Sequence, residues 1–225
     1  MRCEFSLDHY IEILIESKRL DYSIYSFSDW INSEVPKLPG RTIILRHDID
    51  VSVNSALTMA EIELDYGVIS TFFCRLHSSY YNLRDAGTAG LMAKLSTNSE
   101  IGLHYERMYY DSIEGEDTDL LMKDREEICR LLEVNIQGCA AHLPGKNGSF
   151  DEEIVKLAGF DFEAYAGRFV KDRKYISDSG SRWREGCLCE WLGKEDHLTV
   201  LIHPVWWTGW HETKETVVYR LGLGD

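Results

Sequence analysis

The sequence predicts an α/β protein, a single-domain (β/α) barrel with parallel strands inside and helices outside. Apolar segments rich in β-branched residues alternate along the chain with segments of helical periodicity, which is typical of a parallel sheet covered by helices. Several strand-like segments end in His, Asp or Glu, as barrel strands do where their carboxyl ends form a site. The 225 residues suffice for one large core and show no shift in composition, so one domain over residues 1–225 is expected.

Residues 1–40 are expected to form an N-terminal helix and a loop that pack on the barrel. Apolar side chains recur at helical spacing over residues 7–18. Pro36 and Pro39 punctuate the loop that follows. The apolar run RTIILR, residues 41–46, then predicts the first buried strand.

Two further segments of each kind follow this strand. Residues 55–66 have a helical pattern, and Gly67 is expected to end the helix as a C′ glycine. Residues 68–76 are rich in β-branched and aromatic side chains, which favours a second strand. A helix is expected over residues 84–95, although two glycines lower its helix propensity, and residues 99–106 predict a third strand.

Residues 118–159 are expected to form two more helices with a strand between them. Residues 118–133 predict a long helix with acidic residues near its N-terminus, where the helix dipole favours them. Residues 135–142 predict a fourth strand. Ser149 begins a capping-box pattern that predicts a short helix, which Gly159 would end.

The C-terminal part is less regular. Residues 160–166 alternate between apolar and polar side chains, which predicts a fifth strand. Residues 174–186 are expected to form a polar loop that includes one short strand. Residues 197–204 predict the last clear strand, closed by Pro204.

Composition limits the kinds of partner. The formal net charge is −14 and the isoelectric point is near 5.0. Surfaces that bind nucleic acid or anionic membranes are strongly basic, so neither is expected as a partner. No apolar stretch approaches the ~18 residues of a membrane span. The sequence gives no signal for the oligomeric state.

The six cysteines are scattered without the spacing of a disulfide framework. The first nineteen residues carry acids through their apolar part, unlike a signal peptide. A reduced cytoplasmic protein with free thiols is therefore expected. Cys187 and Cys189 form a C-x-C pair, which alone is a weak metal signal, so we expect ordinary buried or edge-strand thiols there.

Reactive side chains follow the apolar part of four predicted strands. They are His47, Asp48 and Asp50 after the first strand, His104 and Glu106 after the third, His142 after the fourth and His203 after the last. Because the carboxyl ends of barrel strands converge on one face, one site is expected there. The other histidines, which are expected to lie at the surface or make local hydrogen bonds, are His9, His77, His197 and His211.

Asp48 and Asp50 are two residues apart and therefore share one face of a strand, with His47 directed elsewhere. Two carboxylates at this spacing repel each other unless a divalent cation offsets their charge. One aspartate can bind the ion while the other remains free as a base. A solvated strand end or a helix N-cap is the alternative for an isolated Asp-x-Asp. His104 and Glu106 have the same spacing, and two nitrogens with one carboxylate and an open position suit Zn²⁺.

The segments LRHDID, EIGLHYE, AHLPG and LIHP, in this order, resemble the successive motifs of the polysaccharide deacetylase family (carbohydrate esterase family 4, the chitooligosaccharide deacetylase homology domain). The resemblance covers residues 41–210 and points to a divergent bacterial branch linked to surface-polysaccharide synthesis. It implies a deformed, incomplete (β/α) barrel of about seven strands. It also implies one divalent metal ion, with Zn²⁺ expected first and Mn²⁺, Co²⁺ or Ni²⁺ compatible with the same ligands.

The family's motifs imply roles for four of these residues. The first motif implies Asp48 as the catalytic base and Asp50 as a metal ligand, and the last implies His203 as the catalytic acid. The second motif implies His104 as a ligand, but its second histidine falls on Met108. A thioether is a poor ligand for a hard, oxygen-rich site.

The third motif has a histidine, His142, where the family has an arginine. His142 is therefore expected to complete the ligand set with Asp50 and His104. Glu106 is the competing third ligand.

Two stretches, residues 178–184 and 204–210, are expected to line the substrate side. The residues predicted to bind substrate are Asp178, Arg182, Trp183, Trp206 and Trp207, with Arg184 and Trp210 as further candidates. Tryptophans offer flat faces to a sugar ring, and arginines pair with carboxylate or phosphate. The alternative is that the tryptophans pack the barrel mouth and that the aspartate caps a turn.

The expected function is metal-dependent hydrolysis of a linear amide C–N bond. It would remove an N-acyl group, foremost acetyl, from an amino sugar or nucleotide-sugar precursor of a bacterial surface polysaccharide. One alternative is an amidohydrolase acting on a non-sugar amide or cyclic imide. The other is a non-catalytic saccharide-binding barrel, because the ligand set is altered at Met108; the presence of both Asp48 and His203 argues against it.

Overall fold

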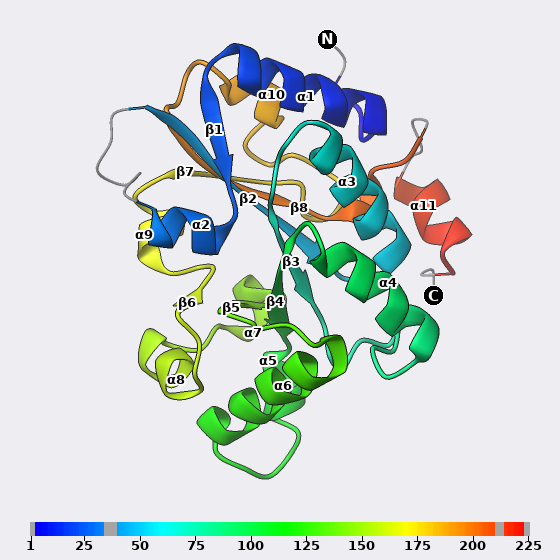
Figure 1. Cartoon of the computed structure of the whole chain (residues 1–225), viewed down its shortest axis with the longest axis vertical. Helices are drawn as coiled ribbons and strands as arrows, with labels where there is room; N and C mark the ends of the chain where they lie inside the picture. The colour runs from blue at the N-terminus through cyan, green and yellow to red at the C-terminus, as the bar shows by residue number, and fades with distance from the viewer. Residues whose placement is uncertain (1–2, 34–39, 210–213, 223–225) are drawn as a thin grey trace.

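A curled parallel sheet forms the centre of the structure, a computed structural model that describes residues 3–33, 40–209 and 214–222 (Figure 1). Its strands are β1 (Tyr22–Tyr25), β2 (Arg41–Ile49), β3 (Thr71–Cys74), β4 (Glu100–Tyr105), β5 (Gly138–Ala141), β6 (Phe162–Glu163), β7 (Lys174–Ser177) and β8 (His197–Ile202). Seven of them follow one another in the order β6-β5-β4-β3-β2-β8-β7. No ladder joins β6 to β7 within the described ranges, so the sheet is a half-barrel. The predicted incomplete (β/α) barrel is confirmed.

β1 is a strand that the sequence did not predict. It pairs with β2 over Arg41–Ile44, whereas β3 pairs with β2 over Arg46–Ile49. β8 overlaps both ladders on β2, so β1 and β3 lie on the same side of that strand, one after the other. The N-terminal part of the chain therefore contributes a strand to the sheet, in addition to the expected helix.

Helices surround the sheet (Figure 1). They are α1 (Leu7–Arg19), α2 (Phe27–Asn32), α3 (Val53–Asp65), α4 (Ala86–Ser96), α5 (Arg107–Tyr110), α6 (Asp117–Leu132), α7 (Pro144–Asn147), α8 (Glu152–Leu157), α9 (Gly167–Val170), α10 (Leu188–Trp191) and α11 (Lys214–Arg220), with a 3₁₀ turn η2 (Pro204–Trp206). A large apolar core joins α3, α4 and α6 to the outer face of the strands. No helix of the described residues is both long and apolar enough to cross a membrane.

The ends of two helices lie at the glycines that the sequence predicted, and the start of one helix does not lie where it was predicted. Gly67 and Gly159 have φ of +63° and +86°, and each follows the C-cap of a helix, as predicted. The predicted capping residue of α8 was wrong by two positions. Asp151, not Ser149, is the N-cap, because its carboxylate accepts hydrogen bonds from the backbone N–H groups of Glu153 and Ile154.

An aromatic cluster fills the inside of the half-barrel. It includes Phe27 of α2, Ile44 of β2, Phe73 of β3 and Phe162 of β6, all fully or almost fully buried. Gly138 of β5 makes room for it, because a Cβ atom at this position would lie 1.9 Å from the Phe162 ring. This cluster forms an apolar floor. The polar residues lie above it at the carboxyl ends of the strands, which we call the mouth of the half-barrel.

Candidate functional site

Every second residue along β2 faces the inside of the half-barrel, from the apolar floor to the mouth. Ile44 belongs to the aromatic cluster, and Arg46, Asp48 and Asp50 follow at steps of two residues. Side chains at this spacing point to the same face of a strand. His47 points to the other face, where its Nε2 lies 2.6 Å from a carboxylate oxygen of Glu63 on α3. The structure confirms the prediction that Asp48 and Asp50 share one face and that His47 lies on the other.

Asp48 is held by a buried arginine from its own strand. Arg46 Nε donates to Asp48 Oδ1 at 3.1 Å, and Nη2 donates to Oδ2 at 2.7 Å. Arg46 is fully buried and also donates to the hydroxyl of Tyr165 at 3.0 Å. Burial alone would raise the pKa of Asp48, but the charge of Arg46, with smaller contributions from His104 and His203, outweighs burial and lowers it. Asp48 is therefore an ionised carboxylate in a fixed orientation at neutral pH.

Three of the predicted metal ligands lie together. Asp50 Oδ1 is 3.3 Å from His104 Nε2 and 3.7 Å from His142 Nε2. One ligand atom from each of these residues lies within 4.8 Å of the others. Asp50 Oδ1 is buried and has no hydrogen-bond partner in the described part of the chain. Burial would raise the pKa of Asp50, but the three surrounding histidines outweigh it and lower the pKa, so a charged oxygen faces two imidazoles.

The hydrogen bonds of His104 favour a metal-binding tautomer. Its Nδ1 lies 2.9 Å from the carbonyl oxygen of Ala140 on the adjacent strand. A carbonyl only accepts, so Nδ1 must carry the proton, and the neutral ring then presents the lone pair of Nε2. Nε2 lies 3.4 Å from Asp48 Oδ2 as well as 3.3 Å from Asp50 Oδ1. In this tautomer Nε2 and the carboxylate oxygens could bind the same divalent cation.

His142 follows β5 at a strained turn. The next residue, Leu143, has φ of +53°, in the left-handed region that costs a non-glycine residue about 1–3 kcal/mol. His142 Nδ1 lies 3.6 Å from Glu106 Oε1, on the side of the ring away from Asp50. Glu106 in turn pairs with Arg75. Glu106 therefore contacts the outer nitrogen of this imidazole, and it is not part of the cluster of ligand atoms.

Met108 lies away from this group. It is on α5 and its side chain is 60% exposed. The residue at this motif position thus faces solvent, while His142 occupies the mouth beside His104, with ring centroids 5.2 Å apart.

His203 lies near one carboxylate oxygen of Asp50, and His142 lies near the other. Its Nε2 is 3.7 Å from Asp50 Oδ2, and its Nδ1 is 2.6 Å from Asp178 Oδ1. Burial would lower the pKa of His203, but the charge of Asp178, the hydrogen bond to it and the charges of Asp50 and Asp48 raise the pKa to about 9. The imidazole is thus protonated at neutral pH and presents an N–H to the mouth.

Two of the residues predicted to bind substrate are buried beside His203. Asp178 is fully buried, and its carboxylate accepts from the backbone N–H of His203 and from Nε1 of Trp207 as well as facing the His203 ring. Trp207 is 3% exposed and packs edge-on against Phe5 and Tyr10. Asp178 therefore contacts both His203 and Trp207, and contact of either Asp178 or Trp207 with substrate stays a prediction.

The other candidates differ in their exposure. Trp183 and Trp206 are half-buried, and Trp183 stacks on Phe5 at 5.9 Å between ring centroids. Arg182 and Arg184 are exposed. Trp210 lies outside the described residues.

A cavity of about 450 Å³ opens beside the cluster. Its lining residues come from the segment after His142, from the turn after β6, and from β7 and the loop that follows it; they are Leu143, Pro144, Gly145, Lys146, Tyr165, Tyr175, Ser177, Ser179, Arg184 and Glu185. Tyr165 connects this cavity to the site, since its hydroxyl accepts from Arg46. Sequence reasoning missed both tyrosines and Lys146. Of the lining residues, only Ser179 and Arg184 belong to the stretch 178–184 that was expected to line the substrate side.

No protein-family model and no curated protein sequence matches the chain. The fold itself is that of carbohydrate esterase family 4, the polysaccharide deacetylases, as the sequence motifs had implied. A mutant of BA3943, described as a CE4 family pseudoenzyme, has 18% identity to the chain and a TM-score of 0.50 over 82% of this chain and 63% of its own.

Two further solved structures are similar at slightly lower scores. Wild-type BA3943 from Bacillus anthracis has 20% identity and a TM-score of 0.49, over 82% of this chain and 61% of its own. The Streptococcus pyogenes deacetylase PplD in complex with acetate has 13% identity and a TM-score of 0.49, over 88% of this chain and 81% of its own. The chain spans less than two thirds of the pseudoenzyme's length. At these identities the likeness concerns the fold.

Proposed function

We propose that the protein is a metal-dependent hydrolase that removes an N-acyl group, foremost acetyl, from an amino sugar. The observation that carries this proposal is the cluster of Asp50, His104 and His142 between two buried pairs, Asp48 with Arg46 and His203 with Asp178. The cluster offers a carboxylate and two imidazoles, the donor set that Zn²⁺ accepts when a further position is left open. An acid and a base on either side of such a centre suit amide hydrolysis.

Asp50, His104 and His142 would hold the ion, and Glu106 would orient the His142 ring from its outer nitrogen. Carboxylates in this position fix the tautomer of a ligand histidine and raise its basicity. The ion would supply Lewis-acid polarisation of the substrate carbonyl and activation of the attacking water.

Asp48 would accept the proton of the attacking water. Its carboxylate lies within 3.4 Å of His104 Nε2, and Arg46 fixes its orientation. Because Arg46 also lowers the pKa of Asp48, the carboxylate is ionised and ready to accept a proton across the whole neutral range. Its low basicity would limit its contribution to the rate enhancement, because a base is most effective when its pKa is near the working pH.

His203 would donate a proton to the departing amine. It is protonated at neutral pH because its pKa is raised to about 9, and its Nε2 lies on the side of Asp50, 3.7 Å from Oδ2. Asp178 holds Nδ1 and so determines which nitrogen donates.

The cavity suggests the kind of sugar. Tyr165 and Tyr175 offer aromatic faces, and Lys146 and Arg184 place two cations at its rim. Cations of this kind pair with phosphate or carboxylate, which favours a nucleotide-linked or lipid-linked amino-sugar precursor of a bacterial surface polysaccharide. A cytoplasmic location would give the protein access to such precursors.

A second candidate is a barrel that binds a saccharide without turning it over. It is favoured by one observation, the exposed Met108 at the motif position where a ligand histidine is expected. The two candidates differ in product formation.

The test compares zinc content and acetate release in the wild type and single variants. His142→Ala should lose one zinc equivalent and its activity, whereas the exposed His197→Ala should change neither. The substrates are a panel of N-acetylated nucleotide sugars, with cyclic imides as the competing class. Unchanged zinc in His142→Ala and in Glu106→Ala would refute the site, and zinc bound without acetate from any substrate would favour the binding protein.

A further inference from the structure

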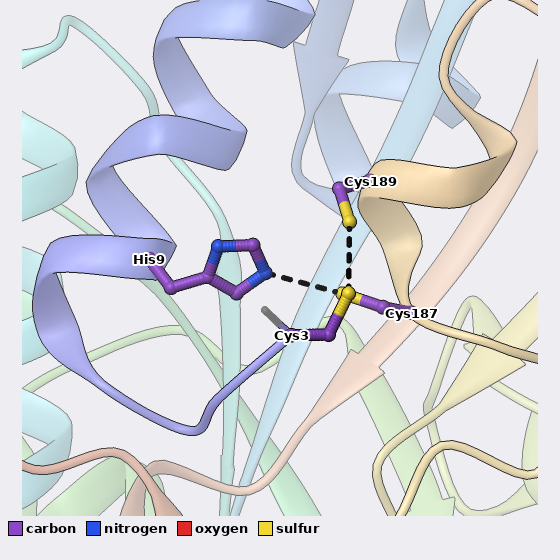
Figure 2. Close-up of side chains that lie close together, drawn as sticks. All are labelled: Cys3, His9, Cys187 and Cys189. Carbon is purple, nitrogen blue, oxygen red and sulfur yellow. Dashed lines mark hydrogen bonds between the residues drawn. The ribbon is translucent and has the colours of Figure 1, made fainter. Parts of the chain in front are cut away.

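Four potential metal ligands converge at a second place, remote in sequence from the motifs of the mouth. Cys3 and His9 come from the N-terminal segment and the first turn of α1, and Cys187 and Cys189 come from the start of α10 (Figure 2). One ligand atom from each residue lies within 4.8 Å of the others. Figure 2 shows the four side chains pointing toward one another from two separate segments.

The distances within this group match a small tetrahedral centre. Cys3 Sγ is 3.4 Å from Cys189 Sγ, and His9 Nε2 is 3.4 Å from Cys187 Sγ. Bonds of about 2.3 Å to sulfur and about 2.0 Å to nitrogen place the ligand atoms of tetrahedral Zn²⁺ roughly 3.5–3.8 Å apart. The two 3.4 Å distances are therefore within a few tenths of an ångström of those in a zinc site, and the remaining pairs lie within 4.8 Å.

The second nitrogen of His9 is already held by a carboxylate. Nδ1 lies 3.2 Å from Glu12 Oε2, one turn further along α1. The carboxylate accepts, so Nδ1 carries the proton and Nε2 presents its lone pair to Cys187. Ligand histidines of metal sites almost always donate their other ring N–H to a carboxylate, a backbone carbonyl or water. His9 is only 4% exposed and Cys187 only 1%, so both are fixed in place.

The donor set also distinguishes this group from the mouth of the barrel. Three thiolates and one imidazole are soft ligands that select zinc over the hard, oxygen-preferring ions. Four protein ligands fill a tetrahedral shell and leave no position for water or substrate, as in structural zinc sites. A disulfide between any two of the cysteines would use neither the third thiol nor the imidazole.

We infer that Cys3, His9, Cys187 and Cys189 form a structural zinc site that fastens the N-terminal segment to the start of α10. The expectation of ordinary thiols at Cys187 and Cys189, and of only a local role for His9, is replaced by this proposal. The site would join residues up to 186 positions apart in the sequence.

The position of this site gives it a structural role. Phe5, between Cys3 and His9, stacks on Trp183 and contacts Trp207 edge-on, and the His9 ring lies parallel to Trp207 at 6.5 Å. Trp207 donates to Asp178, which holds His203. The zinc site would therefore anchor the layer of aromatic side chains behind the catalytic histidine.

The experiment separates this zinc from the one proposed at the mouth. The full chain is purified under reducing conditions as the Asp50→Asn/His104→Ala double variant, which disables the mouth, and its zinc is measured by mass spectrometry and X-ray absorption. The expected result is about one zinc per chain with three sulfur neighbours at about 2.3 Å and one nitrogen at about 2.0 Å. No zinc, or zinc bound only by nitrogen and oxygen, would overturn the proposal.

Cysteine variants of the otherwise wild-type chain provide the second measurement. Cys189→Ser should lose one zinc equivalent while keeping the zinc of the mouth, and Cys129→Ser, a cysteine of similar exposure outside the group, should lose none. Thiol titration of the native protein should find Cys3, Cys187 and Cys189 protected until a chelator removes the metal. Full zinc in Cys189→Ser, or a disulfide among these three cysteines in the reduced preparation, would contradict the site.

Discussion

Removing the arginine behind Asp48 should destabilise the protein strongly. Arg46→Met keeps a side chain of similar length but deletes two hydrogen bonds to Asp48, at 3.1 and 2.7 Å, and one to Tyr165 at 3.0 Å. Both members of the ion pair are almost completely buried, at 0% and 2% side-chain exposure. Breaking a buried pair and leaving the other charge unpaired costs about 3–5 kcal/mol. We expect Arg46→Met to lose this amount in free energy of unfolding.

The assay is urea denaturation at fixed pH and zinc concentration for the single variants Arg46→Met and Asp48→Asn and for the double variant. The double variant should lose less than the sum of the singles, with a coupling of about 1–3 kcal/mol. Arg41→Met is the matched control on the same strand, because Arg41 pairs with the exposed Asp196 and such pairs contribute only about 0–1 kcal/mol. Additive losses, or a loss in Arg46→Met no larger than in the control, would refute the reasoning.

The pH dependence of stability provides an independent test of the same pair. In the wild type the pKa of Asp48 is lowered, so its contribution is present above the unfolded pKa of about 3.9 and is lost as the pH falls through the folded value. In Arg46→Met burial remains while the arginine is gone, so the pKa of Asp48 should be raised. The stability of the variant relative to the wild type should then fall further as the pH rises above about 4.

Three further outcomes are expected. Asp178→Asn removes the main charge that raises the pKa of His203 to about 9, so the alkaline limit of acetate release should move down by about two pH units; an unmoved limit would exclude His203 as the acid. Glu106→Gln should weaken zinc binding at the mouth about 10–100-fold in a competition titration, and unchanged affinity would show that the outer nitrogen of the ligand imidazole needs no carboxylate. Gly138→Ala should lower the free energy of unfolding by about 1–3 kcal/mol in urea because its methyl group meets the Phe162 ring, and a neutral result would mean that the ring moves aside.

The sequence indicated that the side chains of the site would lie close together, because the signals for the strands before them were local. Asp48, Asp50 and His104 lie on or just after strands whose apolar runs are clear, and the carboxyl ends of parallel strands meet at one edge. The clustering of Asp50 and His104 with His142 follows from that rule together with strand order.

Arg46 was missed although it stands two residues before Asp48. A polar residue within an apolar run can face either side, and only the structure shows that Arg46 lies inside the half-barrel, with its guanidinium against Asp48 and Tyr165. β1 was missed for a different reason. Four residues, YSIY, are too short to show alternation, and the pairing with β2 is what makes them a strand.

The surroundings of the tryptophans and the cysteines could not be predicted, because the residues that contact them are far away in the sequence. Whether Trp207 is exposed depends on Phe5 and Tyr10, which are about two hundred positions away in sequence. The C-x-C pair became a candidate zinc site only when Cys3 and His9 were placed beside it. No local pattern contains that information.

The most direct test of the central claim is a zinc-edge anomalous difference map from crystals of the protein grown with zinc. A divalent ion at the mouth predicts a peak about 2.0–2.2 Å from Asp50 Oδ1 and from Nε2 of both His104 and His142. Anomalous density only at the cysteine group, with none among these three residues, would contradict the claim that the half-barrel holds a catalytic metal.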